Sequence, residues 1–299
     1  MSDHFFLLLN PALPADEDKS SVSWCRVSAA GEKKLGHGTL ADAAQASDEA
    51  HVTVILPGQF CASYKAQLPG MNRRRQAQAV PFMLEEQLID DIDDLHFALG
   101  ETDDGAVDVI VVRRSLMDQW LEQLQAEQIV AQHLVVDYQT ISLPSDGWHV
   151  WFDDNGIMLR TGQTSGMRIV LTEPMKMLRQ LYEEADHKPT TLLVSGNSEG
   201  LRDELAAWCE TEQISLQQES ESILLDSAAT TLATLKGTNL LQGSYSHKEN
   251  MSRQWRPWWP AAAVIAMMVM IQLVNISSIF TLHSHLYIGR SDLLSQSTK

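Results

Sequence analysis

The spacing of hydrophobic and polar positions predicts alternating strands and helices over the first 245 residues. Short runs of apolar, β-branched and aromatic residues, bounded by Pro, Gly or polar residues, predict strands. In the first part of the chain these predicted strands cover residues 5–9, 22–27, 51–56 and 60–68. An Ala-rich helix is predicted at 40–50, and Gly31 is expected to begin a turn rich in Gly and Lys. This order of elements indicates an α/β protein.

The strongest helical pattern lies further along the chain. Apolar residues recur three and four positions apart at Val80, Leu84, Leu88, Ile92 and Leu95. The opposite face of this predicted helix is acidic and carries Glu85, Glu86, Asp90, Asp91, Asp93 and Asp94. Pro81 either lies in the first turn, where a missing N–H has little effect, or breaks a longer helix. A metal site formed by these acids with His96 is not expected, because a run of charges on such a face is normally solvated.

The remaining pattern indicates a duplication. Residues 108–112, 115–127 and 133–136 form a predicted strand–helix–strand unit, which implies a parallel pair of strands joined by a crossover. From Trp148 the pattern starts again, with a hairpin, a third strand and then helices and strands in alternation. These elements are predicted at 148–153, 157–161, 167–171, 174–185, 191–195, 201–212 and 227–235. Because both halves open with antiparallel strands and continue in the same order, we predict a duplicated α/β architecture.

A stretch near the C-terminus has the composition of a membrane-spanning helix. Residues 257–282 contain no Asp, Glu, Lys or Arg, and a helix over 258–280 would be about 34 Å long, enough to cross a hydrocarbon core of about 30 Å. Lys248, Arg253 and Arg256 precede it, and this excess of positive charge predicts that the N-terminal domain is cytoplasmic. The expected organisation is a cytoplasmic domain over 1–245, a juxtamembrane linker over 246–257, a single transmembrane helix over 258–282 and a short periplasmic tail over 283–299.

The predicted membrane helix carries groups suited to contact with another helix. Gln272 and Asn275 are polar side chains at membrane depth, where they favour hydrogen bonds across helices. Ala262 and Ala266 are small enough to allow a neighbouring helix to approach closely. We therefore predict a helix–helix contact through these four residues.

Composition limits the classes of partner and the compartment. The chain has 39 Asp and Glu against 22 Lys and Arg, a formal net charge of −17, and all but one of the acids precede residue 251. A domain this acidic repels phosphate backbones, so nucleic acid is not an expected partner, whereas basic protein surfaces are. Cys25, Cys61 and Cys209 are scattered, which suits a reducing cytosol and excludes a disulfide framework. No cleavable signal peptide is expected, because an acid stands where its basic region belongs.

The loops that could bind a nucleotide lack the features of phosphate-binding loops. Duplicated α/β folds such as those of actins and sugar kinases hold phosphate on glycine-rich hairpin turns between their two halves. Here the turn at 10–14 has no Gly and lies near several acids, and the turn at 153–156 has one Gly and two acids. The stretch 194–200 follows a predicted strand but offers only isolated glycines, and no Walker-type motif is present. We therefore predict a protein that is not an enzyme and has no cofactor or metal site.

Two motifs resemble the type II secretion system protein L family (GspL). The block from Val80 to Phe97 is similar to that family's Pro-aromatic-x-Leu-Glu-Asp/Glu block, which ends in Asp-x-His-Phe. The segment from Asn239 to Tyr245 is similar to its Asn-Leu-Leu-x-Gly-Ser/Thr-Phe/Tyr segment. In that family a Trp-containing basic linker and one membrane span follow, and Trp255 fits such a linker here. The resemblance extends over the order of elements along the whole chain.

This resemblance implies a protein of the inner membrane of Gram-negative bacteria. Its cytoplasmic domain would have an actin-like (duplicated RNase H-like) fold without a working ATPase, and would recruit the secretion ATPase (GspE) to the membrane. The transmembrane helix would pair with protein M (GspM), and the domain would form a homodimer. The motifs do not map the ATPase interface, for which we predict the acidic residues between Glu85 and Asp94. Family members continue beyond the span into a periplasmic domain, whereas this sequence stops at Lys299, about 17 residues after the span, so contacts with protein M are expected here through the span.

Two other functions remain open on the sequence alone. A nucleotide-binding, actin-like switch of a pilus or secretion assembly would have the same fold class, and Mg²⁺-dependent ATP binding would distinguish it from a scaffold. A transmembrane regulator would respond to a periplasmic signal through its cytoplasmic domain. The tail predicted at 283–299 argues against the regulator, because it offers little surface for sensing a signal.

Overall fold

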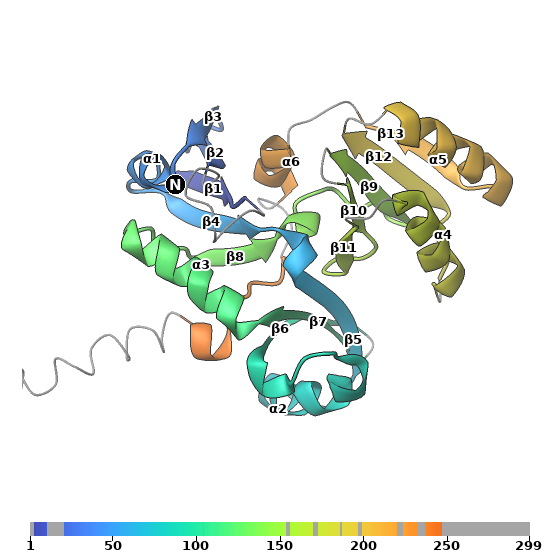
Figure 1. Cartoon of the computed structure of the whole chain (residues 1–299), viewed down its shortest axis with the longest axis horizontal. Helices are drawn as coiled ribbons and strands as arrows, with labels where there is room; N and C mark the ends of the chain where they lie inside the picture. Colours follow the sequence, from blue (N-terminus) through green and yellow to red (C-terminus); the bar gives the residue numbers. More distant parts are fainter. Residues whose placement is uncertain are drawn as a thin grey trace, which may run out of the picture. The chain divides into compact units, whose positions relative to one another are not determined.

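The computed structural model describes residues 3–10, 21–103, 105–153, 156–169, 173–185, 187–196, 199–219, 224–231 and 237–246. The chain divides into two compact units, Met1–Gln242 and Gly243–Lys299. The described residues of the first unit form two five-stranded sheets and one three-stranded sheet (Figure 1). The described part of the second unit is a single 3₁₀ turn, Gly243–Tyr245, with the residue that follows it.

The first sheet is mixed and has the strand order β3-β2-β1-β4-β8. Its strands are β1 (His4–Leu8), β2 (Val22–Val27), β3 (Lys33–Gly38), β4 (His51–Leu56) and β8 (His133–Val136). β1, β2 and β3 are antiparallel neighbours, whereas β4 is parallel to β1 and β8 to β4. Phe5 and Phe6 point to opposite faces of β1 and both are buried, so each face of the sheet is covered.

Most of the strands predicted in this half are confirmed, but the turn predicted after Gly31 is wrong. Residues 33–38 form β3, an edge strand whose Lys33 and Lys34 side chains are exposed. A sequence rich in Lys and Gly lacks the apolar alternation that marks a half-buried strand, and charged edge strands are a common protection against aggregation. The helix predicted at 40–50 is α1 (Leu40–Ala46), which begins at a capping box between Thr39 and Asp42.

The second sheet repeats the connectivity of the first, in the order β11-β10-β9-β12-β13. Its strands are β9 (Gly147–Asp153), β10 (Gly156–Arg160), β11 (Gly166–Ile169), β12 (Thr191–Gly196) and β13 (Ser215–Gln218). The helices α4 (Pro174–Glu184) and α5 (Glu199–Glu212) pack on it. In their core, Tyr182 lies edge-on to Trp148 and Trp208, with ring centroids 6.3 and 5.1 Å away. The predicted duplication is therefore confirmed.

A three-stranded antiparallel sheet is inserted into the first half. It comprises β5 (Cys61–Gln67), β7 (Ala106–Arg113) and β6 (Leu95–Asp103), in that order, with helix α2 (Arg73–Leu84) packed on it. The predicted parallel pairing across 108–136 is wrong, because β7 belongs to this sheet and β8 pairs with β4. Helix α3 (Arg114–Ala126) thus leads from the inserted sheet back to the first sheet.

The helix predicted from Val80 to Leu95 is also wrong. Helix α2 begins after Asn72, whose Oδ1 caps the Arg75 N–H at 3.0 Å, and ends at Leu84, three residues after Pro81. The acidic residues that follow form two 3₁₀ turns, Glu85–Gln87 and Ile92–Asp94, before β6 begins. Asp side chains compete for backbone N–H groups, as Asp91 does by accepting from the Asp93 N–H, and this favours turns over a continuing helix. Val80, Leu84, Leu88 and Leu95 therefore reach one core from a helix, a turn and a strand.

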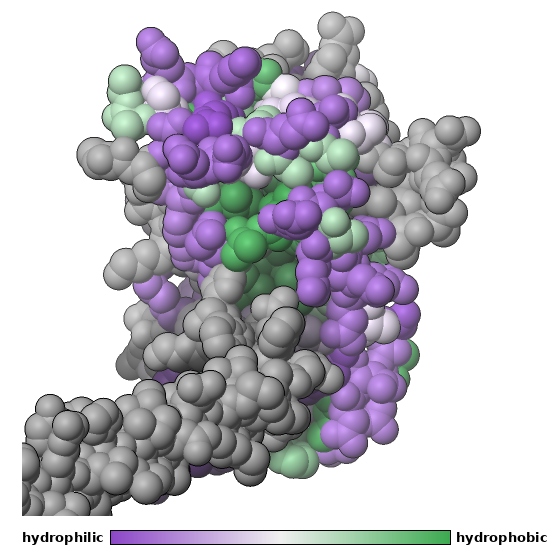
Figure 2. All heavy atoms as spheres, turned by 90° about the vertical axis from the view of Figure 1, so that its left-hand side faces the viewer, coloured by the Kyte–Doolittle hydropathy of each residue, from purple (hydrophilic) through white to green (hydrophobic). Residues whose placement is uncertain are grey.

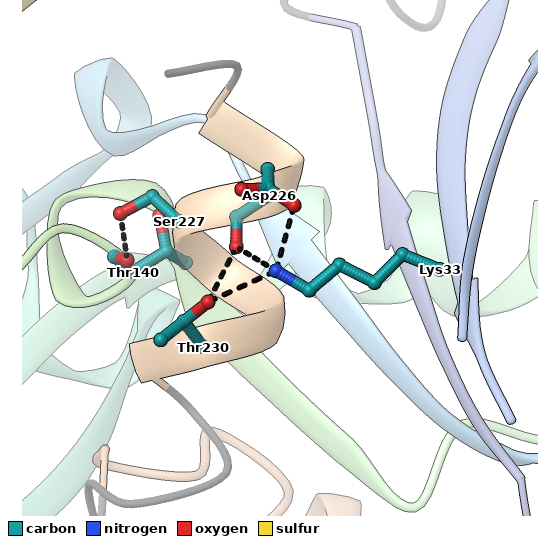
Figure 3. Close-up of polar contacts among 5 residues, drawn as sticks. All are labelled: Lys33, Thr140, Asp226, Ser227 and Thr230. Carbon is teal, nitrogen blue, oxygen red and sulfur yellow. Dashed lines mark hydrogen bonds and ion pairs between the residues drawn. The ribbon is translucent and has the colours of Figure 1, made fainter. Parts of the chain in front are cut away.

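Helix α6 (Leu224–Thr231) covers a face of the first sheet. Figure 3 shows how it is held: Lys33 on β3 donates to the Asp226 carboxylate at 2.7 Å and to the Thr230 hydroxyl at 3.1 Å. On its other side, the Ser227 hydroxyl donates to the Thr140 carbonyl at 3.2 Å. The helix predicted at 227–235 is thus placed a few residues earlier, and residues 232–235 lie outside the described residues.

Residues 239–242, called the strap below, join β8 to the inserted sheet. The Asn239 carboxamide oxygen accepts from the Leu134 N–H at 3.0 Å, and its amide donates to the Gln132 carbonyl at 3.2 Å. The Leu240 N–H donates to the Leu134 carbonyl at 2.8 Å. The strap therefore adds short strand-like pairing to the edge of β8, which explains why the motif begins with Asn-Leu.

The same strap is bonded to β6. The Gln242 side chain accepts from the Leu99 N–H at 3.2 Å and donates to the Leu99 carbonyl at 2.9 Å. His96, buried in β6, donates from Nε2 to the Leu240 carbonyl at 2.7 Å. His96 therefore points toward the strap and is not grouped with the acidic residues that precede it.

The predicted membrane segment falls outside the described residues. This applies to the transmembrane helix at 258–282, the tail at 283–299, the linker beyond Ser246 and the contact residues Ala262, Ala266, Gln272 and Asn275. Among the helices that the structure does describe, none combines the length and the apolar character needed to span a bilayer.

Candidate functional site

A cleft of about 210 Å³ lies where the strands of the first sheet end. Its described lining comes from β1, β2, β3, the residues after β4 and β8, the second sheet and the start of α6. The polar side chains that line it include Ser23, His37, Asp137, Asp153 and Arg168. In open α/β sheets, ligands bind in crevices at the carboxyl ends of parallel strands, so this is where a ligand of the fold would be sought.

One arginine and two aspartates occupy the charged end of this cleft. Arg168 on β11 donates from Nε to Asp137 Oδ2 at 2.9 Å and from Nη1 to Asp153 Oδ2 at 2.7 Å. Asp137 follows β8 of the first sheet, and Asp153 ends β9 of the second. The side chains of Arg168 and Asp137 are 5% and 2% exposed, so this ion pair between the two sheets is shielded from water.

Burial dominates the electrostatics of these groups. It raises the pKa of Asp137, an effect that the Arg168 guanidinium opposes. Burial by itself would lower the pKa of Arg168, but Asp137 and Asp153 outweigh it, so the pKa of this guanidinium is raised. Breaking such a pair would leave a charge in an environment of low polarity, which is strongly destabilising.

A second buried arginine also holds the first half to the second. Arg160 on β10 donates from Nη1 to the carbonyls of Gln139 and Ile141, at 2.8 and 2.5 Å. Its other nitrogens donate to the carbonyls of Gly162 and Gln163, at 3.1 and 2.5 Å. Burial lowers the pKa of Arg160 to about 10. Sequence reasoning missed both arginines, because each meets its partners only through the fold.

The cleft is poorly equipped to hold a nucleotide. Arg168 is the only Lys or Arg among the described residues that line it, and both aspartates already engage it. A phosphate would have to displace a carboxylate and would meet the remaining negative charge. The volume is also below the roughly 300–1,000 Å³ of typical ligand pockets. The candidate loops at 11–14, 154–155 and 197–198 lie outside the described residues.

A buried serine–histidine pair lies within the second half. His149 Nδ1 donates to the Ser142 carbonyl at 2.7 Å, so Nε2 accepts from the Ser195 hydroxyl, also at 2.7 Å. Glu219 Oε2 lies 3.1 Å from the same hydroxyl. Burial lowers the pKa of His149. Because neither Ser195 nor His149 is exposed to solvent, a substrate cannot reach them, and the pair joins β9 to β12.

The acidic residues predicted as a partner interface lie in the segment between α2 and β6, outside the lining of this cleft. Asp90 is held by Arg113 through hydrogen bonds of 2.8 and 3.0 Å, and Asp91 caps the following 3₁₀ turn by accepting from the Asp93 N–H. The remaining members are exposed and comprise Glu85, Glu86, Asp93 and Asp94. Sequence reasoning did not single out the exposed apolar side chains beside them, Phe82 and Ile89.

Two sheets of equal connectivity, with a cleft at the ends of their strands, define an actin-like fold. The fold is similar to the solved cytoplasmic domain of EpsL, described as an inner membrane component of the type II secretion system of Vibrio cholerae. The TM-score is 0.68 at 18% sequence identity, covering 82% of this chain and 100% of that one. A chain of the PilM–PilN type IV pilus biogenesis complex is similar with a TM-score of 0.52 at 15% identity, covering 77% and 97%.

Sequence comparison narrows this class to one family. The family model for type II secretion system (T2SS), protein L matches residues 13–248, and the chain belongs to that family. The type II secretion system protein L of Pectobacterium carotovorum subsp. carotovorum is 27% identical over 252 residues, which cover 81% of this chain and 57% of that protein. The chain thus spans little more than half the length of that relative.

Proposed function

We propose that this chain is an inner-membrane scaffold of the type II secretion system without catalytic activity of its own. The observation that carries the proposal is the buried Arg168 ion pair, which occupies the charged end of the cleft where an actin-like fold would hold nucleotide. An arginine that bridges the two sheets serves to fix their arrangement. Because the chain belongs to the protein L family, we assign this rigid domain to the type II secretion system.

In this role the cytoplasmic domain, residues 1–245, recruits the secretion ATPase (GspE). The membrane helix predicted at 258–282 holds the domain at the inner membrane, pairs with protein M (GspM) and leaves the domain free to form a homodimer. Attachment to the membrane raises the effective concentration of the ATPase at the assembly site. Recruitment therefore requires binding by the scaffold and no catalytic activity.

Cosedimentation with vesicles tests recruitment. The full chain is reconstituted in vesicles of phosphatidylethanolamine and phosphatidylglycerol and mixed with the purified secretion ATPase. We expect the ATPase to sediment with these vesicles and to remain in the supernatant with vesicles that lack the chain. Equal sedimentation in both cases would contradict the proposal.

Measuring nucleotide binding distinguishes the scaffold from the alternative function, an actin-like switch. The alternative is considered because the fold is similar to that of a chain in the PilM–PilN complex. Titration of the full chain in detergent with Mg²⁺ and ATP should give no binding at micromolar concentrations, because Arg168 is already engaged. Micromolar affinity, or ATP hydrolysis by the purified chain, would instead support the switch.

A further inference from the structure

Three histidines lie together at the end of the first sheet where its parallel strands begin. They are His4, the first residue of β1, His51, the first of β4, and His133, the first of β8. His4 and His51 are direct partners across β1 and β4, and His133 is the partner of Thr53, two residues further along β4. Because alternate residues of a strand share a face, all three histidine side chains project from the same face of the sheet. Sequence reasoning missed this group, because its members are far apart in the chain.

The imidazole rings of these histidines are neighbours. His51 Nε2 and His133 Nδ1 lie 3.1 Å apart, and the two ring centroids are 5.2 Å apart. The ring of His4 lies on the β1 side of His51, with a distance of 5.5 Å between the ring centroids. When His51 and His133 are both neutral, one of the two facing nitrogens donates a proton and the other accepts it. Two metal-binding nitrogens from different strands therefore already point toward one another.

The histidine group is accessible to a dissolved ion. His4 and His133 are exposed, and His51 is partly buried. Figure 1 shows β1, β4 and β8 beginning on its left-hand side, and Figure 2 views that side, much of which is covered by hydrophilic side chains. Partial burial and the neighbouring His4 both lower the pKa of His51. The neutral imidazole, which is the form that binds a metal ion, is therefore favoured at neutral pH.

The spacing and the type of these side chains suit a transition-metal ion. Two nitrogens bound to one tetrahedral Zn²⁺ at about 2.0–2.1 Å lie about 3.3–3.4 Å apart, which differs by only a few tenths of an ångström from the spacing between His51 and His133. Imidazole is a good ligand for Zn²⁺, Ni²⁺ and Cu²⁺, whereas Mg²⁺ and Ca²⁺ prefer oxygen. Within the described part of the chain, no group of three His, Cys, Asp or Glu side chains is already arranged to hold an ion. His4 would therefore turn about its side-chain bonds to complete the site.

We propose that His51, His133 and His4 bind one divalent transition-metal ion of the class of Zn²⁺, Ni²⁺ and Cu²⁺. His51 Nε2 and His133 Nδ1 are the first two ligands, His4 is the third, and water is the fourth. The ion takes the place of the proton between the first two rings, and that proton moves to the other nitrogen of its own ring, so both imidazoles stay neutral. The ion links three strands at the end of the sheet opposite the cleft. This site does not depend on the proposed scaffold function.

Isothermal titration of the full chain in detergent with ZnCl₂ tests the site. The reference chain is purified without a histidine tag and carries His283→Gln and His285→Gln, as do all variants, so that these two histidines add no signal. We expect the reference chain to bind one Zn²⁺ at micromolar concentrations. His51→Gln together with His133→Gln should weaken binding at least about tenfold, because it removes two ligands. His4→Gln should weaken binding by a smaller factor.

Electron paramagnetic resonance of the same samples with one equivalent of CuCl₂ identifies the ligands directly. The spectrum of the reference chain should show hyperfine splitting from imidazole nitrogens bound to Cu²⁺. This splitting should disappear in the variant that carries His51→Gln and His133→Gln. A purely structural role of the two histidines would not produce this signal.

The matched control is His187→Gln, which replaces an exposed histidine in the second half. It should bind Zn²⁺ as the reference chain does, and without metal all variants should melt within a few degrees of the reference chain. Added Zn²⁺ should raise the melting temperature of the reference chain, because an ion that binds only the folded state stabilises it. The variant without His51 and His133 should not respond in this way.

Three results would overturn the metal site. They are the absence of Zn²⁺ binding to the reference chain at millimolar concentrations, binding that survives the loss of His51 and His133, and binding that is lost equally in the His187→Gln control. Unchanged binding in His4→Gln would refute the role of the third ligand. Each of these results leaves the scaffold proposal standing, because recruitment of the ATPase is measured separately.

Discussion

One buried histidine, His96, makes the stability of this domain depend on pH. His96 is 4% exposed, donates to the Leu240 carbonyl of the strap, and has a pKa that burial lowers to about 4. In an unfolded chain a histidine has a pKa of about 6.5. Between these two values the unfolded chain binds a proton that the folded chain does not, so stability must fall as the pH falls.

Lowering the pH from 7.5 to 5 should therefore cost about 2 kcal/mol through His96 alone. His149, whose pKa burial also lowers, acts in the same direction. The measurement is urea unfolding of the full chain in detergent at both pH values, for the unchanged chain and for His96→Gln. The variant should be less stable at pH 7.5 but should lose less on acidification. An identical pH dependence in both would show that His96 does not carry this effect.

Among the elements, the strap shows how four residues join two sheets. Asn239 satisfies one N–H and one carbonyl at the edge of β8, and Gln242 does the same for Leu99 on β6. Such edge groups, if buried without a partner, are unfavourable by about 1–3 kcal/mol each. The motif is therefore a structural requirement where the chain leaves the domain, and it also explains why His96 lies opposite it.

Asn239→Ala should lower the free energy of unfolding by about 2–3 kcal/mol, because it leaves the Leu134 N–H and the Gln132 carbonyl without these partners. Asn239→Asp keeps the acceptor for the Leu134 N–H and should lose less. Gln87→Ala, a change at an exposed position, is the control and should stay within about 0.5 kcal/mol. An Asn239→Ala variant as stable as that control would contradict the role given to the strap.

At the scale of the whole molecule, two arginines of the second half fix it to the first. Arg168 reaches Asp137, and Arg160 reaches the carbonyls of Gln139 and Ile141, so both act on the segment that follows β8. Gly58 leaves this segment room: a Cβ there would lie 2.5 Å from Asp137 Oδ1. Rigid attachment between halves suits a scaffold, whereas a nucleotide switch needs halves that move.

Arg168→Met should lower the free energy of unfolding by about 3–5 kcal/mol, because it leaves the Asp137 carboxylate buried and unpaired. Adding Asp137→Asn to this variant should restore part of the loss. Arg179→Met removes an exposed pair with Glu204 and should cost no more than about 1 kcal/mol. If Arg168→Met were no more damaging than Arg179→Met, the arginine would not hold the two halves together.

Local patterns were enough to predict most strands and the duplication. The strands at 22–27, 51–56 and 133–136 match β2, β4 and β8, because apolar β-branched runs bury their side chains in any sheet that they join. The errors came where local patterns conflict with packing. The helix expected from Val80 to Leu95 ends at Leu84, and β3 is an exposed edge strand without a buried face.

The amino-acid sequence by itself determined the α/β class, the acidic character, the family motifs and an apolar stretch of membrane-spanning length. Only the tertiary structure decided which strands share a sheet, where the acidic residues lie, and how Arg168 meets Asp137 and Asp153. The reason is physical. Hydrophobic periodicity acts between near neighbours in the chain, whereas an ion pair depends on side chains tens of residues apart that meet only after the sheets have packed.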